Sequence, residues 1–308
     1  MAAGVIARIV AAAKWAGSNG ARVLVGGRAA YALLALPLLA HALDPDVPRL
    51  PAQPDTPSVA VGVRYLTNRT LDRDGPEGLV YGDGRGTPRV GRCEVQFTPI
   101  PLLGDLAVRV PFYIPSETKA VRVTEQSDAV AFWDELSSAA AGTATGSVVL
   151  FVHGYSNGFE RACRMAAELQ RALEGQATVL LFSWPSRGRP LEYARDQAAL
   201  EWSVPLLAEA LDRLDRRIGW SKTQVLAHSL GSRGIVFALE WLGKPPASGA
   251  TLRNLVLLAP DFDAQAFPAH LPRIGPLTRA ITLYASENDA PLKVSEQVHG
   301  APRLGQGG

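Results

Sequence analysis

The residue with the clearest chemical potential is Ser229, which ends an apolar run in "VLAHSLGSRG" (225–234). Ala227-x-Ser229-x-Gly231 is a variant of G-x-S-x-G, the nucleophile elbow, in which a serine occupies a strained turn between a strand and a helix. Small residues flank such a serine because larger side chains would clash, and alanine at the first position differs from glycine by one methyl group. The run before Ser229 predicts a buried strand, and "LGSRGIVFALEWL" after it predicts a helix. We therefore favour a nucleophilic serine at the carboxyl end of a strand over a small-residue turn that only packs a helix on a strand.

A second motif, "LFVHGYSNG" (150–158), places a His-Gly pair after an earlier apolar run. Gly154 would let the backbone approach a substrate, and the amides of Tyr155 and Leu230 would together bind a developing oxyanion. His153 is more typical of a residue that orders such a loop than of a base. The sequence therefore predicts an oxyanion hole built from Tyr155 and Leu230.

Two carboxylates compete for the role of catalytic acid. Asp289 follows the apolar run "RAITLYA", and Asp261 follows the earlier run "RNLVLLA" in "APDFD". The chain order Ser…Asp…His accommodates either residue. We favour Asp289, because the acid must orient an imidazole from an adjacent strand end. The other carboxylate would cap a helix or bond within its loop.

The histidine base is the weakest part of the pattern. His41 lies in the N-terminal leader, His228 points away from the serine side chain, and His270 precedes the last predicted strand. His299 comes only ten residues after Asp289, on what reads as the helix that follows that strand. The base is expected after one further strand, which the sequence does not contain. We therefore hypothesise a truncated version of a longer chain, with His299 as the alternative base.

The elements that must position these residues alternate from residue 147 onward. Apolar runs that predict strands buried on both faces of a parallel sheet occupy 147–152, 178–184, 223–229, 253–259 and 279–285. Helical patterns separate the first three runs, as a parallel crossover requires. This alternation predicts an α/β fold with a mostly parallel, doubly wound sheet flanked by helices, whose last strand is missing.

A β-rich N-terminal part precedes the alternating region. Its strands are predicted at 59–67, 93–100 and 106–114, with a polar, glycine-rich loop at 68–91. The folded unit is therefore expected to span 59–308, with 59–115 as the β-rich part and 147–308 as the α/β part.

Composition excludes several classes of protein. The chain has 308 residues, 47% hydrophobic and 19% charged, which suits a soluble globular protein. Residues 1–43 hold four basic and no acidic residues, so the remainder has 27 basic against 29 acidic residues and no basic face for nucleic acid. Cys93 and Cys163 form no CxxC motif and are expected to be two unpaired, packed thiols rather than a disulfide. An incomplete calcium-loop pattern at Asp72 and Asp74 is rejected, so neither a metal nor a cofactor is expected.

The N-terminus has the pattern of a leader. "AAYALLALPLLAHAL" (29–43) is short for a transmembrane helix, follows Arg22 and Arg28, and ends near a small-x-small pattern. Residues 1–43 are therefore predicted to be a signal peptide or a membrane anchor, and 44–58 a proline-rich spacer. We expect an exported protein (periplasmic or secreted) or one anchored to a membrane through this segment.

Several stretches in order along residues 59–305 resemble a bacterial α/β-hydrolase family of uncharacterised function. They are "YLTNR", "YGDGRG", "GRCEV", "VHGYSNGF", "FSWPSRG", "AHSLGSR", "LAPDFD", "YASENDAPL" and "HGAPRLG". The resemblance implies a serine-hydrolase fold, with the catalytic acid after a late strand and the histidine further on. It gives little about the substrate.

Two functions of different classes follow. The first is a serine hydrolase acting on a small carboxylic ester, thioester or lipid-like acyl substrate through a Ser-His-Asp mechanism. The second is a non-catalytic envelope protein that keeps the fold as a binding surface, for which the missing base is the main support. Trp184 in "FSWPS" would line the acyl pocket or belong to the core, and the sequence favours neither. The oligomeric state is not predicted.

Overall fold

The computed structural model describes residues 58–74, 78–99, 117–189, 192–243, 249–285, 292, 295–297 and 300–306. The predicted leader and most of the spacer, the predicted strand at 106–114, and the candidates Asp289 and His299 lie outside the described residues.

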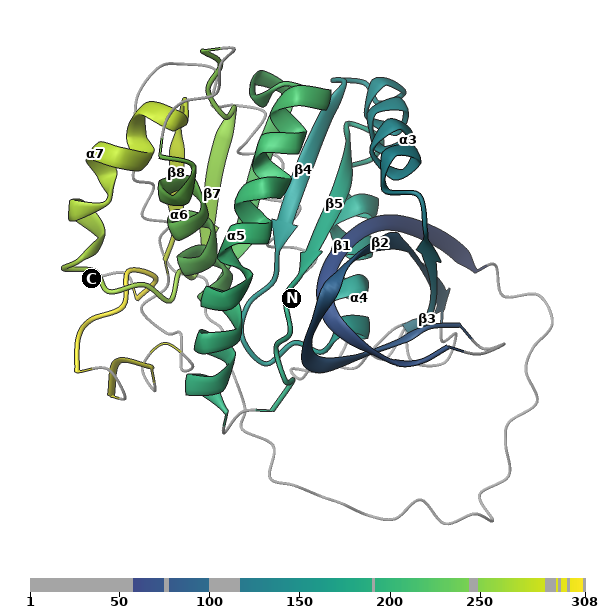
Figure 1. Cartoon of the computed structure of the whole chain (residues 1–308), viewed down its shortest axis with the longest axis horizontal. Coiled ribbons are helices and arrows are strands. Elements are labelled where there is room, and N and C mark those ends of the chain that lie inside the picture. The colour runs from purple at the N-terminus through teal and green to yellow at the C-terminus, as the bar shows by residue number, and fades with distance from the viewer. Residues whose placement is uncertain are drawn as a thin grey trace, which may run out of the picture.

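Eight strands form one mixed sheet in the order β3-β2-β1-β5-β4-β6-β7-β8 (Figure 1). The strands are β1 (Val59–Arg73), β2 (Val80–Pro99), β3 (Glu117–Gln126), β4 (Ser147–Val152), β5 (Ala177–Ser183), β6 (Thr223–His228), β7 (Asn254–Leu258) and β8 (Ile281–Tyr284). Neighbours from β1 across to β8 are parallel, and β2 runs antiparallel to both β1 and β3. The predicted α/β fold with a mostly parallel sheet is confirmed.

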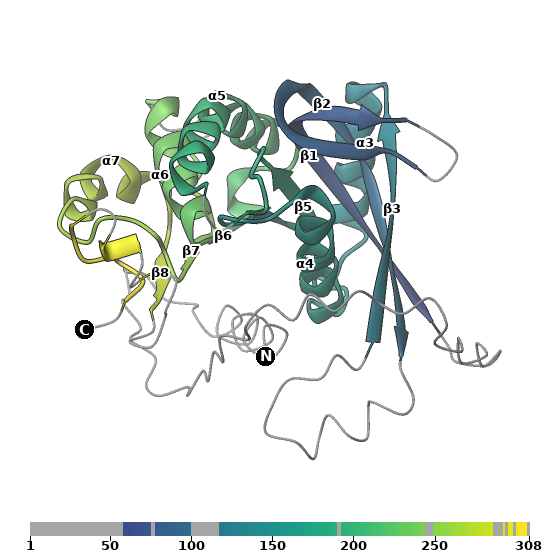
Figure 2. The same ribbon diagram turned by 90° about the horizontal axis from the view of Figure 1, so that it is seen from below.

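Helices cover both faces of the sheet. They are α3 (Ala129–Ala141), α4 (Phe159–Ala172), α5 (Tyr193–Arg217), α6 (Leu230–Leu242) and α7 (Leu271–Ile274), with short 3₁₀ turns at Trp220–Lys222, Phe267–Ala269 and Gly275–Leu277. Helices α3, α5 and α6 share one apolar core with one face of the sheet, and α4 packs on the opposite face (Figure 2). Strands β4, β5 and β7 are buried along their whole length because alternate side chains enter the two cores. Within the described part of the chain, no helix is long and apolar enough to cross a membrane.

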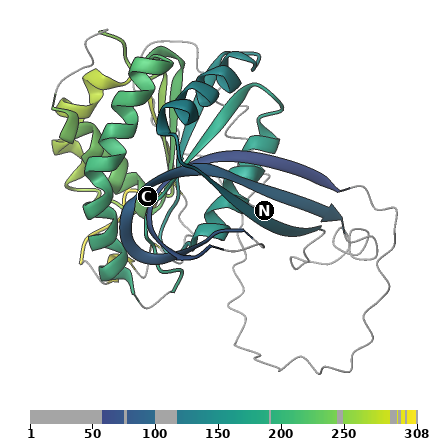
Figure 3. The ribbon, with the colours of Figure 1, turned by 45° about the vertical axis from the view of Figure 1, so that its right-hand side comes forward.

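The predicted loop over 68–91 is wrong. Strand β1 continues to Arg73 and β2 begins at Val80, so the pair forms a long, curved ribbon that extends beyond the parallel sheet (Figure 3). Its register shifts several times in the second half of β1, and such irregularities increase strand curvature. A Cβ atom at position 86 would lie 2.5 Å from the Arg69 carbonyl oxygen. Glycine is therefore required there because the two strands approach closely, and it does not mark a loop. The edge strand β3 was also not predicted.

Strand β8 lies at the other edge of the sheet. Among the described residues up to 306 no further strand follows it. Residues 302–305 instead return to the loop after β7, where Leu304 donates its amide to the Phe262 carbonyl (2.7 Å) and Gly305 donates to the Pro260 carbonyl (2.9 Å). The described C-terminal residues therefore lie at the edge where the parallel strands end.

Candidate active site

Ser229 occupies a strained turn between β6 and α6. Its backbone has φ 51° and ψ −124°, a conformation that costs a non-glycine residue about 1–3 kcal/mol. The Ser229 amide donates to the Leu258 carbonyl (2.8 Å), which ties the turn to the end of β7. A serine at a helix N-cap ordinarily bonds the first-turn amides, but the Ser229 side chain makes no such bond. The hydroxyl is half-buried and hydrogen bonds to no residue that the structure describes.

Backbone strain gathers at the same edge of the sheet. Four described non-glycine residues have positive φ, and three of them follow the ends of β4, β6 and β7: Ser156 (56°), Ser229 (51°) and Ala259 (42°). Strained residues persist only where the surroundings hold them, and they concentrate at functional sites. This edge is therefore the candidate active site.

The loop after β4 lies directly against the nucleophile elbow. A Cβ atom built on Gly154 would lie 2.9 Å from the Ser229 Cβ, 2.9 Å from the His228 carbonyl oxygen and 2.6 Å from the His228 Nδ1. A Cβ atom on Gly231 would lie 2.5 Å from the His153 carbonyl oxygen. Both glycines are needed because the two segments approach at backbone contact distance.

The two predicted oxyanion donors lie in these two segments. Leu230 is the first residue of α6, so its amide has no partner within the helix and points along the positive end of the helix dipole. Tyr155 follows Gly154. The surrounding loop is fixed by other groups, since the Asn157 side chain donates to the carbonyls of Gly154 (3.0 Å) and Tyr155 (2.9 Å). Within the described structure neither amide donates a hydrogen bond to another residue.

His153 orders the loop and does not serve as a base. Its Nδ1 bonds the Gly154 carbonyl (2.9 Å), and its ring stacks on Trp184 with the centroids 5.0 Å apart. Burial, helped by the Arg69 charge, lowers the pKa of His153 to about 3. The ring is therefore neutral, with Nδ1 as donor and Nε2 facing Ser183 (3.4 Å) and Arg69 (3.5 Å).

Neither of the other two described histidines hydrogen bonds to the Ser229 hydroxyl. His228 is half-buried beside Gly154, burial lowers its pKa to about 4, and its Nδ1 has no hydrogen-bond partner in the described structure. His270 bonds Glu240 (2.8 Å) and packs against the Phe262 ring. A base for Ser229 is therefore not found among the described residues.

Asp261 is placed near the nucleophile but is fully engaged elsewhere. Its backbone amide donates to the Ser229 carbonyl (3.2 Å). Its carboxylate accepts from Arg303 Nε, Ser295 Oγ and Tyr193 Oη, each at 2.7 Å. Asp261 and Arg303 are both 3% exposed, so they form a buried ion pair. The carboxylate holds the C-terminal segment rather than an imidazole, and this leaves Asp289, outside the described residues, as the candidate acid.

Two residues of the C-terminal segment reach the active-site edge. Ser295 and Arg303 both bond the carboxylate of Asp261, whose own amide bonds the Ser229 carbonyl. This anchoring was not predicted from the sequence. Its signal was the arginine in "HGAPRLG".

Trp184 belongs to the core. It has no exposed surface, and its indole N–H donates to the His153 carbonyl (2.9 Å). Trp184 therefore supports the loop after β4 through this hydrogen bond, and it does not line an open acyl pocket.

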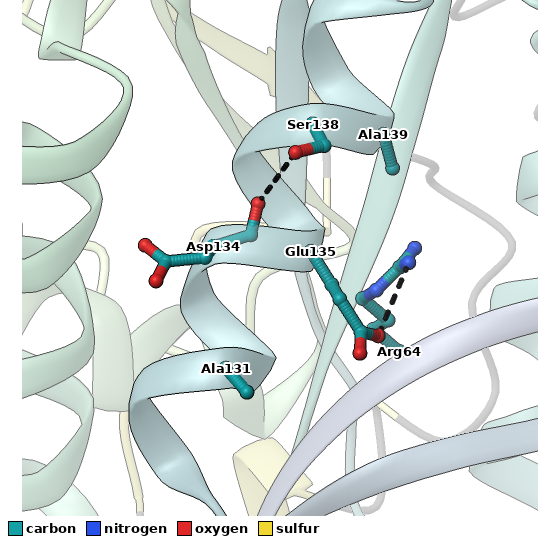
Figure 4. Close-up of a pocket in the computed structure, with 6 residues that line it drawn as sticks. All are labelled: Arg64, Ala131, Asp134, Glu135, Ser138 and Ala139. Atoms are coloured by element: carbon teal, nitrogen blue, oxygen red, sulfur yellow. Dashed lines mark hydrogen bonds and ion pairs between the residues drawn. The ribbon is translucent and has the colours of Figure 1, made fainter.

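A pocket of about 670 Å³ lies apart from this edge, between α3 and β1 (Figure 4). It is lined by Arg64, Ala131, Asp134, Glu135, Ser138 and Ala139. Arg64 and Glu135 form a weak ion pair there (3.8 Å). None of the candidate catalytic residues lines it, and a surface pair of this length contributes little. No group of three or more His, Cys, Asp or Glu side chains in the described ranges is arranged to hold a metal ion.

Comparison with known proteins assigns the chain to a family. Residues 128–307, more than half of the chain, match the family described as "Alpha/beta hydrolase of unknown function (DUF900)". The chain belongs to this family. The protein is therefore an α/β hydrolase, as the resemblance in the sequence implied. The match spans β4, the elbow and the C-terminal residues that contact Asp261.

Solved structures give only distant likenesses. One of two esterases from the fungus Rhizomucor miehei is 14% identical over 70% of this chain and 48% of its own, with a TM-score of 0.25. A Legionella pneumophila protein is 11% identical over 61% of this chain and 50% of its own, with a TM-score of 0.26. The chain thus spans about half the length of these proteins, and likenesses at this level carry no argument about activity. Among curated proteins no sequence matches the chain.

Proposed function

We propose that the protein is a serine hydrolase in which Ser229 attacks a carboxylic ester, a thioester or a lipid-like acyl substrate. The observation that carries the proposal is the strained Ser229 backbone, held against Gly154 with a hydroxyl that no described residue bonds. A turn that only packed a helix would have no reason to retain this strain or to leave the serine uncapped.

The chemistry proceeds in two transfers. Ser229 Oγ forms a bond to the acyl carbon as its proton passes to a base, and the carbonyl oxygen becomes an oxyanion. The amides of Tyr155 and Leu230 bind that oxyanion, and each such donor contributes about 3–4 kcal/mol of transition-state stabilisation. The alcohol or thiol leaves with the proton, and water then releases the acid by the reverse sequence.

The base is a histidine outside the described residues, and His299 is the candidate within this sequence. Asp289 orients it. Asp261 does not, because its oxygens are already bonded to Arg303, Ser295 and Tyr193. The substrate is a small acyl compound, nucleic acid is not a partner, and the leader pattern of residues 1–43 supports export or membrane attachment.

The second candidate is a non-catalytic envelope protein that binds a ligand at the same edge. Its support is that none of His153, His228 and His270 reaches the nucleophile.

Hydrolysis of p-nitrophenyl butyrate by matched serine variants separates the two candidates. If the protein is a serine hydrolase, we expect turnover that is lost in Ser229→Ala and kept in the control variant Ser203→Ala. The control removes the hydroxyl of a buried serine on α5. Equal turnover in both variants, or none in the wild-type protein, would refute the hydrolase function. Comparing His299→Ala with His270→Ala then identifies the base, since His270 is bonded to Glu240 away from the elbow.

A further inference from the structure

Arg69 is an arginine of β1 that is almost completely inaccessible to solvent (1% exposed). All five of its side-chain N–H groups face acceptors. These are Ser183 Oγ (3.0 Å), the carbonyl oxygens of Gly82 (3.1 Å), Ser186 (2.9 Å) and Asn157 (2.8 Å), and His153 Nε2 (3.5 Å). A guanidinium with every donor matched is a rigid connector, because its planar fork fixes the direction of each bond.

Four of the five acceptors belong to segments that meet at the candidate active site, and the fifth, the Gly82 carbonyl, lies in β2. His153 and Asn157 lie in the loop after β4, which carries the oxyanion donor Tyr155. Ser183 ends β5, and Ser186 lies in the loop that follows it. Arg69 therefore joins the oxyanion loop to the neighbouring strand end.

Asp196, near the start of α5, fixes the same loops from another direction. It is fully buried and accepts from the Ser156 amide (3.2 Å), the Arg187 amide (2.9 Å) and Ser186 Oγ (2.5 Å). The backbone just after Tyr155 is thus held by a buried carboxylate.

Ser186 links the two charged residues. Its carbonyl accepts from Arg69, while its hydroxyl accepts from the Asn157 amide (3.0 Å) and donates to Asp196. Burial lowers the pKa of Arg69 to about 10, with Asp196 opposing the shift, so the guanidinium stays charged at neutral pH. The opposite charges of Arg69 and Asp196 are thus connected through hydrogen bonds to Ser186, without a direct ion pair between them.

We propose that Arg69 and Asp196 are positioning residues, which hold the loop after β4 so that the Tyr155 amide faces the oxyanion formed at Ser229. This role rests on the proposed hydrolase function. Neither residue touches the substrate, and both act through the loop. Their loss should slow the chemical step more than it weakens substrate binding, because an oxyanion contact forms in the transition state.

The mildest test removes the Ser186 hydroxyl, which bonds Asp196 and the Asn157 amide, and keeps both charges and the bond from Arg69 to the Ser186 carbonyl. Ser186→Ala is compared with Ser203→Ala, which deletes another buried serine hydroxyl; this one bonds Asn68 of β1 and the Ala199 carbonyl of α5 and no residue of the loop after β4. We expect kcat for p-nitrophenyl butyrate to fall about tenfold in Ser186→Ala with KM nearly unchanged, a fraction of the effect of losing one oxyanion donor. We expect Ser203→Ala to keep both constants.

Arg69→Lys and Asp196→Asn extend the test. Each should lower kcat by about 100-fold, and the double variant should lose little more than either one, since both residues act on one loop. Thermal unfolding of every variant identifies those that remain folded at the assay temperature. An unchanged kcat in folded Arg69→Lys and Asp196→Asn, with Ser229→Ala inactive, would overturn the positioning role and leave the hydrolase intact. An inactive wild-type protein that no acylating probe labels would overturn both.

Discussion

Replacing Gly154 by alanine places a methyl group between the loop after β4 and the nucleophile. The new Cβ would lie 2.9 Å from the Ser229 Cβ and 2.6 Å from His228 Nδ1. Carbon atoms pack at about 3.5–4.0 Å, so the two segments must separate by about half an ångström or more. An oxyanion hole tolerates donor distances of about 2.7–3.1 Å, and this movement takes the Tyr155 amide outside that range. We therefore expect kcat to fall by about 100-fold and the free energy of unfolding to fall by about 1–3 kcal/mol.

Gly158→Ala is the matched control in the same loop. A Cβ on Gly158 meets nothing within 4 Å, and its backbone (φ −64°, ψ 166°) is open to any residue. Its kcat and stability should stay close to the wild-type values. Steady-state hydrolysis and urea unfolding measure both variants. A folded Gly154→Ala protein with wild-type kcat would show that this loop does not face the reacting atoms of the substrate.

Three further predictions concern buried polar groups. Asp261→Asn should lower the free energy of unfolding by about 3–5 kcal/mol in urea titrations, because it leaves the buried Arg303 without its counter-ion. Asp289→Asn should instead lower kcat with little loss of stability. The reverse result would exchange the roles of the two carboxylates. Burial lowers the pKa of His153 from 6.5 to about 3, so only the unfolded chain protonates this imidazole as pH falls from 7.5 to 5. The wild-type protein therefore loses stability over that range, and His153→Gln should recover about 2 kcal/mol of that loss. An equal loss in wild type and variant would contradict that assignment. Cys93 and Cys163 are buried and form no disulfide, and burial raises the pKa of the Cys163 thiol. Both thiols should therefore react with a disulfide reagent only after unfolding. Fast reaction of the native protein would refute their burial.

The parallel part of the fold could be predicted because its signal is local. Strands buried on both faces read as continuous apolar runs, and the five predicted from residue 147 onward agree with the structure to within two residues at each end. The turn at Ser229 was predictable for the same reason, since the small flanking residues and the change from strand to helix all lie within a few positions.

The β1–β2 ribbon could not be predicted because the glycines of β2 are required by contacts with β1, which is distant in the sequence. Gly82, Gly84 and Gly86 resemble a loop in sequence, yet each faces a side chain or carbonyl of β1 at a distance that leaves no room for a Cβ atom. Close approach between two strands is invisible to a pattern of neighbours along one strand.

The buried network at the candidate site was missed for a related reason. Arg69, Asp196 and Arg303 are charged residues, and charged residues usually lie on the surface. Four of the five partners of Arg69 lie 84 to 117 positions away, and the Asp261 partner of Arg303 lies 42 positions away, which no local pattern indicates. The motifs that contain Arg69 and Arg303 were visible in the sequence, but the contacts were not.

The most direct test of the central claim is the position of a covalent adduct. The folded protein is treated with a fluorophosphonate, which reacts with activated serines, and the modified peptide is identified by mass spectrometry. The hydrolase account predicts one adduct on Ser229, at the elbow between β6 and α6, and none in Ser229→Ala. An adduct on another serine, or an unmodified Ser229, would contradict it.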